Sequence, residues 1–589
     1  MERASQPAER ARPVFRATIL DIPLLLFLFS QIISTIFSID QNLSLFGYQS
    51  RLNGGLLSLI AYALLYWAYV ANIETRDTRK VIRMLLISGV IVSIWGILEH
   101  FGVSLSCLVI RGEIGVGCWQ QNVQERAFAT LGQPNWLAAF IVALMPLAWH
   151  NAIFNFQFPI SKKSAVIWIL VSGLFFLGLL YTKSRSGFVG FVVASGVFWV
   201  ILFIKQRKKA IKPFIILNSI FLILLLVVGS PFRDTRYEID NTKYEGGTES
   251  GNIRAIVWKG AIDVWKHYPI VGSGVETFAW SYYQFKPIEH NLTSEWDYLY
   301  NKAHNEYLNL LANTGILGLG SYLMLILFST LQISNAKFLI SKQIPNTKNK
   351  KLKIENHKLY TIDYALLAGY VGILVTNFFG FSVVVTNLLL FLFPAMTVQS
   401  AQRIVHRKIK LKPIFVVFAL CTMTFALASI CGYWYSDFLY TASLQKYYEG
   451  DHHESLLLIK QALIFRPRNG TYYMQAAKTV AKVSPEQADE ISQYAIELSP
   501  RNIELRKERT NILDELGEVD KIYYQKSLEN LRELELLAPK DVRVKLNIGL
   551  NCLELANVDC AKDAFRQVLL LKPDYEAIDD AIKAIDDII

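Results

Sequence analysis

Long apolar stretches recur along residues 1–435 of this 589-residue chain, separated by short polar segments. A stretch of about 20 mostly apolar residues has the length that crosses a bilayer as a helix. Eleven such stretches begin near Ile19, Gly55, Val81, Trp136, Ala165, Gly187, Phe214, Ile316, Asp363, Val384 and Ile414. The pattern predicts a polytopic helical membrane domain over residues 1–435, with one large loop at about 230–303.

A different pattern occupies residues 436–589. Prolines recur there at intervals of 33, 39 and 34 residues, close to the tetratricopeptide period of 34, at Pro467, Pro500, Pro539 and Pro573. Apolar residues precede each proline at helical spacing. The expected fold is therefore all-α, with about eleven spans followed by an α-solenoid of about four tetratricopeptide-like hairpins. The repeats either bind a protein partner on their concave face or form a rigid extension of the membrane domain.

Charge separates the same two parts. Residues 436–589 hold 20 Lys or Arg against 27 Asp or Glu, whereas residues 1–435 hold 40 against 22. Short basic loops mark the cytoplasmic side of a membrane protein, and here they follow every second span, starting at the N-terminus. We therefore expect a multi-pass protein of the cytoplasmic membrane with a cytoplasmic N-terminus and with the large loop and the repeats outside. Topology explains the basic excess without a nucleic-acid partner.

Composition and cysteine spacing narrow the function classes. The chain is 52% hydrophobic and 19% charged, which excludes a disordered protein. Cys107 and Cys118 share an outer loop, and Cys552 and Cys560 share one repeat, so either pair could be oxidised outside the cytoplasm. No metal-ligand spacing and no phosphate-binding glycine loop occurs, which argues against a protein-held metal and against an ATP-driven pump.

Two polar motifs stand at outer ends of predicted spans. In "RAFATLGQPNWLAAF", Arg126 precedes Asn135 at the entrance to the fourth span. In "YTKSRSG", Lys183 and Arg185 occupy a tight turn between the fifth and sixth spans, on the side where positive charge is disfavoured. A helix start with turn residues explains the first motif without function, and contact with lipid headgroups explains the second.

Two further motifs frame the large loop. "GNIRAIVWKGAIDVWKHYPIVGSGVETF" predicts an amphipathic helix on the membrane surface, with Arg254 in its first turn. "AHNEYLNLLANTGILGLG" predicts a helix opened by His304 and Asn305 that continues into the eighth span. The positive end of the helix dipole favours a neutral imidazole, which suits a general base. A structural histidine is the alternative.

These four motifs, in this order, resemble the O-antigen ligase and Wzy polymerase superfamily of membrane glycosyltransferases over residues 120–400 or so. The resemblance implies transfer of a glycan from an undecaprenyl-pyrophosphate carrier to an acceptor outside the cytoplasmic membrane. It also implies that no metal or other cofactor is needed. The acceptor stays open within the family: a lipid-borne saccharide, another repeat unit of a polysaccharide, or a protein side chain.

The resemblance also implies roles for individual residues. Arg185 and Arg254 would stabilise the departing pyrophosphate, and His304 would deprotonate or orient the acceptor hydroxyl. The remaining site residues would contact the substrate: Arg126, Lys183, Asn135 and Asn305. Asn305 and Glu306 would also help to orient the histidine.

Two other function classes remain as alternatives. A solute transporter would share the hydropathy pattern, but the predicted spans hold few ionisable residues that would mark an ion path. A scaffold that recruits cell-envelope assembly partners through the repeats would leave the arginines and the histidine without a role.

Overall fold

The computed structural model describes residues 17–48, 53–73, 75–157, 162–232, 250–341, 350–401, 413–575 and 578. Within those ranges every regular element is an α-helix or a short 3-10 helix, so the all-α prediction is confirmed. The basic N-terminal segment and residues 233–249 of the predicted large loop lie outside the described residues.

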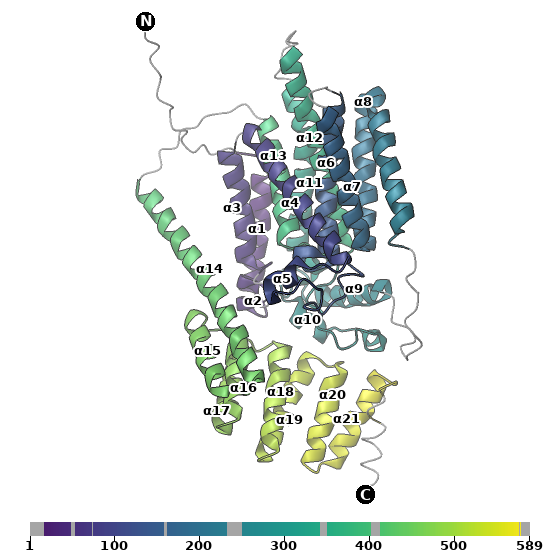
Figure 1. Cartoon of the computed structure of the whole chain (residues 1–589). Helices are drawn as coiled ribbons and strands as arrows, with labels where there is room; N and C mark the ends of the chain where they lie inside the picture. Colours follow the sequence, from purple (N-terminus) through teal and green to yellow (C-terminus); the bar gives the residue numbers. More distant parts are fainter. Residues whose placement is uncertain are drawn as a thin grey trace.

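The first part of the chain forms a bundle of long apolar helices, with shorter helices gathered at one end (Figure 1). We call that end, where α9 and α10 lie, the loop end. The elements are α1 (Asp21–Ile36), α2 (Gln41–Phe46), α3 (Leu56–Asn72), α4 (Thr75–His100), α5 (Leu105–Arg111), η1 (Ala129–Leu131), α6 (Pro134–Gln157), α7 (Lys162–Tyr181), α8 (Arg185–Val228), α9 (Ser250–His267), α10 (Phe278–Gln284), η2 (Ile288–Leu292), α11 (Glu306–Ser341), α12 (Lys350–Phe378) and α13 (Val384–Ala401).

Six spans within the described residues are long and apolar enough to cross a membrane, and four shorter apolar helices accompany them. Helix α8 contributes two of the six, because its backbone leaves the helical region at Gln206, between Arg185–Arg207 and Ala210–Val228. Each of the eleven apolar stretches in the sequence lies on a helix. The number of crossings and their orientation stay predictions.

Helix α6 forms the centre of the bundle. Its apolar span is 89% buried, whereas the other five long spans are at most 39% buried. Close packing against α12 depends on Gly369, where an added Cβ would lie 2.3 Å from the carbonyl oxygen of Ala143. Small residues at such contacts allow membrane helices to approach closely. Burial and close packing therefore hold α6 firmly within the bundle. Its first residue, Pro134, lies at the loop end.

The second part of the chain forms four helical hairpins below the loop end (Figure 1). Successive pairs pack together, and the first helix of the first pair continues from the last apolar stretch of the membrane part. The helices are α14 (Pro413–Tyr448), α15 (His452–Phe465), α16 (Gly470–Ala481), α17 (Pro485–Leu498), α18 (Ile503–Gly517), α19 (Ile522–Leu537), α20 (Val542–Glu554) and α21 (Val558–Leu571).

The recurring prolines mark the ends of the second helices of these hairpins. Each proline follows the last residue of α15, α17, α19 or α21 by two positions, where proline cannot continue the helix. The sequence period therefore corresponds to one hairpin. Classification of the hairpins as tetratricopeptide repeats stays a prediction.

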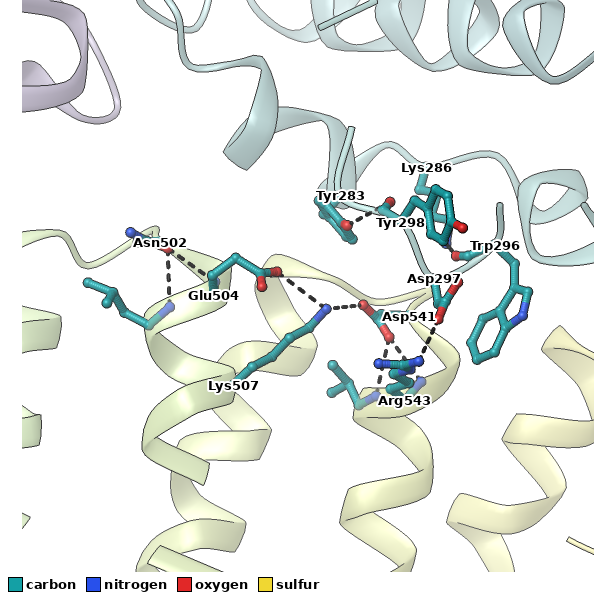
Figure 2. A network of polar contacts seen from close by, with 12 residues as sticks. Tyr283, Lys286, Trp296, Asp297, Tyr298, Asn502, Glu504, Lys507, Asp541 and Arg543 are labelled. Carbon is teal, nitrogen blue, oxygen red and sulfur yellow. Dashed lines mark hydrogen bonds and ion pairs between the residues drawn. The ribbon is translucent and has the colours of Figure 1, made fainter. Parts of the chain in front are cut away.

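The hairpins dock on the segment that leads from α10 towards α11, residues 283–299. Figure 2 shows this docking interface, where loop side chains face the beginnings of α18 and α20. Arg543 lies 2.5 Å from Asp297, and Lys507 lies 3.0 Å from the buried carboxylate of Asp541. Asn291 donates a hydrogen bond to the carbonyl oxygen of Lys540 at 2.9 Å. The repeat part thus contacts the segment that precedes His304.

Aromatic rings fill the same interface. The ring of Trp296 lies 5.5 Å from the guanidinium of Arg543 and 5.4 Å from the ammonium of Lys572. The ring of Tyr283 packs with the apolar core of the repeats, and its hydroxyl donates a hydrogen bond to the carbonyl oxygen of Tyr298. Aromatic residues with nearby cations are typical anchors of stable interfaces.

Both cysteine pairs that the sequence left open form disulfides. Cys107 pairs with Cys118 in the loop after α4, with 5.5 Å between the Cα atoms. Cys552 pairs with Cys560 between α20 and α21, with 5.8 Å between the Cα atoms. Both bonds lie outside the long apolar helices, one at the loop end and one in the repeats. Disulfides at these places agree with an oxidising compartment around the loop end and the repeats.

Candidate functional site

The turn between α7 and α8 joins two of the sequence motifs. Helix α8 begins at Arg185, and Ser184 caps it by accepting a hydrogen bond from the backbone N–H of Gly187 at 3.0 Å. The Ser184 hydroxyl also donates to Oδ1 of Asn135, at 2.7 Å. Lys183 adopts a left-handed backbone conformation, with φ +47°. Asn135 therefore supports the turn that presents the exposed side chain of Arg185.

Arg126 lies against the same turn. The backbone N–H of Ala127 donates to the carbonyl oxygen of Tyr181 at 3.0 Å, and Nε of Arg126 donates to that of Thr182 at 3.4 Å. Much of the Arg126 side chain is exposed, but partial burial of its guanidinium lowers its pKa. Glu125 opposes that shift, and the positive charge of Arg185 adds to it.

Arg254 adds a third arginine from a third segment of the chain. It is the fifth residue of α9 and is half-buried. Burial lowers its pKa most, followed by the positive charge of Arg126; Tyr300 and Glu295 act in the opposite direction. Within the described residues, neither Arg126 nor Arg254 has a carboxylate at ion-pair distance. Arg126 thus lies within charge range of both Arg185 and Arg254.

His304 lies just before α11. Its backbone is left-handed, with φ +53°, and the next residue, Asn305, caps the helix by accepting from the N–H of Leu308 at 3.0 Å. Nδ1 of His304 lies 3.2 Å from the carbonyl oxygen of Lys302. Because a carbonyl only accepts, that contact places the proton on Nδ1 and the lone pair on Nε2. In the neutral imidazole, Nε2 is then the nitrogen that accepts a proton.

Tyr300 links the histidine with the arginines. Its ring centroid lies 5.5 Å from that of His304, and its charge interaction with Arg254 is the third influence on the pKa of that arginine. The Tyr300 hydroxyl donates a hydrogen bond to Glu295. The sequence motifs did not include Tyr300 or Glu295, since both lie in the irregular segment between two motifs.

The two motifs at 251–278 and 303–320 meet at a break in α11. Gly315 leaves the helical region, with φ +62°, and the backbone N–H of Ile316 donates to the carbonyl oxygen of Pro269 at 3.0 Å. In return, the N–H of Gly274 donates to the carbonyl oxygen of Asn313 at 2.8 Å. A Cβ on Gly315 would lie 2.3 Å from the carbonyl oxygen of Ile270. The two motifs are therefore one structural unit that fixes the break within α11.

A cavity of about 370 Å³ opens next to His304, between α1, α11 and α13 and the loop around η1. Phe381 lines it, and the ring of Phe381 lies 5.5 Å from that of His304. Polar side chains of α11 line one wall at helical spacing, from Glu306 through Asn309 to Asn313. That spacing is visible in the sequence, but helical spacing of polar residues does not by itself indicate a cavity wall. The three arginines do not line the cavity.

A buried ion pair closes the cavity on the side of the large loop. Lys302 donates to Glu276, and both side chains are nearly inaccessible to solvent. Glu276 adopts a left-handed backbone conformation, with φ +63°, as do Ala129, Lys183 and His304 in the surrounding loops. Such backbone conformations cost free energy in residues other than glycine and cluster at functional sites. Neither Glu276 nor Lys302 was among the predicted site residues.

In the part of the chain that the structure describes, no three His, Cys, Asp or Glu side chains gather in a way that could hold a metal ion. Charged side chains in the surroundings of His304 include Lys302 and the two cavity glutamates, Glu276 and Glu306, together with Glu295 beyond Tyr300.

A family model described as O-Antigen ligase matches residues 170–323, from α7 into α11. Arg126 and Asn135 precede the matched region, which contains the other predicted site residues: Lys183, Arg185, Arg254, His304 and Asn305. The similarity supports, in general terms, a multi-pass membrane enzyme of the O-antigen ligase type that uses a lipid-linked glycan.

No curated protein matches the chain. Among solved structures, one titled "MamA RS-1 ArsTM double mutant" is 16% identical, with 23% of this chain and 75% of that chain covered and a TM-score of 0.21. At that TM-score the likeness supports no argument about fold or function.

Proposed function

We propose that this protein transfers a glycan from undecaprenyl pyrophosphate to an acceptor hydroxyl at the loop end, on the extracytoplasmic side of the cytoplasmic membrane. One observation carries the proposal. Arg126 lies within charge range of both Arg185 and Arg254. Tyr300 connects Arg254 with His304, whose neutral ring has its lone pair on Nε2. An anion-binding cluster and a general base are the two groups that glycan transfer from a pyrophosphate carrier requires.

The reaction is a single displacement. Nε2 of His304 accepts the proton of the acceptor hydroxyl while the hydroxyl oxygen attacks the anomeric carbon of the donor glycan. The bond between that carbon and the phosphate oxygen breaks, and its electron pair leaves with undecaprenyl pyrophosphate. The proton then passes from His304 to solvent. Attack from the side opposite the leaving group inverts the anomeric configuration.

The arginines stabilise the leaving group. Negative charge grows on the pyrophosphate as the bond breaks, and a guanidinium binds two phosphate oxygens at once and stays protonated at any working pH. Lys183 adds a cation at the same turn, and Asn135 and Asn305 position Arg185 and His304 through their caps and hydrogen bonds. In this proposal the charge stabilisation comes from side chains, with no metal ion.

The test is transfer by the purified protein from a synthetic polyprenyl-pyrophosphate oligosaccharide in the presence of a chelator. Wild type should release polyprenyl pyrophosphate and form a glycosylated product. The variants His304→Ala, Arg254→Ala and Arg185→Ala should fold but lose at least a hundredfold in rate, the usual effect of removing a general base or one charge-stabilising donor, about 10²–10⁴.

Exposed residues of the same types provide matched controls. His453→Ala in α15 and Arg111→Ala in α5 should transfer like wild type, since both side chains are exposed and lie outside the candidate site. If wild type transfers nothing to lipid, glycan or peptide acceptors, or if His304→Ala is as active as wild type, the proposal fails. Solute uptake into vesicles that survives His304→Ala would then favour a transporter. Binding of a protein partner without glycan transfer or solute uptake would favour a scaffold.

A further inference from the structure

Tyr300 and Glu295 lie in the segment that joins the docking interface to His304, and neither takes part in the proposed displacement itself. We propose that these two residues are positioning residues: they hold Arg254 and His304 in the geometry that transfer requires, and the docked repeats hold them. This rests on the proposed transfer reaction. The repeats are then a working part of the active site rather than a separate binding module.

The ring of Tyr300 packs with both the helix that carries Arg254 and the histidine. Tyr300 is 6% exposed and belongs to a buried apolar cluster that includes Ile253 and Val257 of α9. These two residues lie directly before Arg254 and about one helical turn after it. The ring centroid of Tyr300 also lies 5.5 Å from that of His304. Because packed interiors transmit displacements, a shift of this one ring would move both functional side chains.

A hydrogen-bonded pair, Tyr300 and Glu295, influences Arg254 by charge rather than by a direct ion pair. The Tyr300 hydroxyl donates to the carboxylate of Glu295. Burial, followed by this hydrogen bond, raises the pKa of Tyr300, so the hydroxyl keeps its proton and stays a donor. The charge of Glu295 opposes the lowering of the pKa of Arg254, although no carboxylate of the described residues lies at ion-pair distance from that guanidinium. The guanidinium thus stays charged, and its N–H donors remain available for phosphate oxygens.

Glu295 lies in a turn whose next two residues bind the repeats. Its backbone N–H donates to the hydroxyl of Thr293 at 3.3 Å, a contact typical of short turns. Trp296 and Asp297 follow directly and contact Arg543 of α20 (Figure 2). One turn therefore contacts the candidate site through Glu295 and the repeats through the two side chains that follow.

A buried lysine ties the same turn to the repeats. Lys286 is 3% exposed, and its ammonium donates to the carbonyl oxygen of Trp296 at 2.6 Å. Burial lowers the pKa of Lys286 to about 8, and the carboxylate of Asp541, at the start of α20, opposes that shift. A buried cation without a nearby counter-charge costs free energy, so the docked repeats stabilise Lys286 in its contact with the turn. Separation of the repeats would remove that counter-charge from the turn that holds Glu295.

Steady-state kinetics with a synthetic polyprenyl-pyrophosphate disaccharide as donor tests the pair. The acceptor is the one that wild type uses among a benzyl disaccharide, a glycolipid and a Ser/Thr-containing peptide. Tyr300→Phe keeps the ring and removes the hydroxyl, and Glu295→Gln keeps an acceptor and removes the charge. Each should lower kcat roughly tenfold, the effect of one lost hydrogen bond. Both KM values should change by less than about twofold, because charge on the leaving group develops only in the transition state.

Tyr298→Phe is the matched control. The side chain of Tyr298 is 61% exposed, and its carbonyl oxygen, which accepts from the hydroxyl of Tyr283, is kept in the variant. The kcat of this variant should equal that of wild type.

A double-mutant cycle with Arg254→Ala separates positioning from a general loss of structure. If the hydroxyl of Tyr300 acts through Arg254, Tyr300→Phe should change kcat by less than about twofold in the Arg254→Ala background. An equal loss in both backgrounds, or no loss for Tyr300→Phe and Glu295→Gln in the wild-type background, would overturn the positioning role while the transferase function stands. Absence of all transfer by wild type would instead remove the function on which this role rests.

Trp296→Leu tests the contribution of the repeats. It removes the ring beside Arg543 and Lys572, so the amides of residues 293–300 should exchange faster and kcat should fall roughly tenfold, because a small misplacement of reacting groups slows transfer. Trp434→Leu in α14 is the matched control, since its side chain is 71% exposed. It should match wild type in both measurements. Faster exchange in Trp296→Leu with an unchanged kcat would contradict a role of the repeats in holding the site.

Native-state hydrogen exchange of the full-length wild-type protein avoids dependence on variants that fold poorly. In increasing denaturant, residues 293–300 and α20 should lose protection together, as parts of one cooperative unit. Loss of protection in residues 293–300 while α20 stays protected would contradict positioning by the repeats.

Discussion

Positive charges are arranged in opposite ways in the repeat part and at the loop end of the bundle. In the repeats, Arg509 lies 2.6 Å from Asp489 and Arg506 lies 2.6 Å from Glu533. Among the described residues, Arg126 and Arg254 have no such carboxylate partner, and Arg126 lowers the pKa of Arg254. Partial burial of a cation without a counter-ion costs free energy. Paired arginines hold the hairpins together, whereas arginines without a carboxylate partner agree with the proposed binding of a pyrophosphate at the loop end.

The largest expected effects separate these two kinds of arginine. Arg254→Ala should lower the transfer rate by about 10²–10³ and leave the thermal unfolding midpoint equal to or above that of wild type, because it removes repulsion with Arg126. Arg509→Ala should leave the transfer rate unchanged and lower the unfolding midpoint. It removes the ion pair with Asp489 and should destabilise the repeats by about 1–3 kcal/mol, since Lys526 still pairs with that carboxylate.

Transfer assays and calorimetric melts of both variants give this comparison directly. A lower unfolding midpoint for Arg254→Ala with an unchanged transfer rate would assign that arginine a structural role. The contrast between the two regions would then disappear.

Local patterns in the sequence predicted much of the fold. Apolar stretches of bilayer length indicated every long helix of the bundle, and the prolines indicated where each hairpin ends, because both signals depend on neighbours along the chain. The motifs likewise indicated the candidate site residues, which lie at helix starts and tight turns. Asn305 as the cap of α11 and Arg185 as the first residue of α8 are examples.

Contacts between distant segments could not be predicted in this way. The cavity is formed by side chains from α1, α11 and α13, and Gln31 and Asn313 are 282 positions apart in the sequence. The docking of residues 283–299 on the repeats depends on Trp296 and Tyr283, which lie in an irregular segment without periodicity. Such contacts follow from packing in three dimensions, which a single sequence does not display.

An effect of intermediate size is expected for the stability of residues 278–300, the segment that contacts the repeats, when the pH is lowered. Burial, with a smaller contribution from the charge of Lys286, lowers the pKa of His290 to about 3, below its ordinary value of 6.5. The unfolded segment therefore binds a proton that the folded segment does not, and stability is lost as the pH falls below about 6.5. The loss should reach about 2 kcal/mol between pH 7.5 and pH 5.

Hydrogen exchange of residues 278–300 as a function of pH measures this loss. His290→Gln keeps an acceptor for the hydroxyl of Tyr282, which now lies 2.7 Å from Nδ1 of the histidine, but cannot titrate. In this variant, the protection of the backbone amides of residues 278–300 should change little with pH, once the pH dependence of the intrinsic exchange rate is subtracted. Equal acid sensitivity in the variant would assign the effect to other groups.

The smallest expected effect belongs to the ion pair across the docking interface. Arg543 and Asp297 are 55% and 23% exposed, so solvent and salt screen their attraction (Figure 2). A double-mutant cycle of Arg543→Ala and Asp297→Ala should give a coupling free energy below about 1 kcal/mol, which decreases further at high salt. The measurement is the unfolding midpoint of the repeats in each variant. A salt-independent coupling above about 2 kcal/mol would contradict this. With weak coupling, the buried contacts of Trp296 and Tyr283 with the repeats hold the interface, so the hairpins stay docked on the segment before His304 across a wide range of ionic strength.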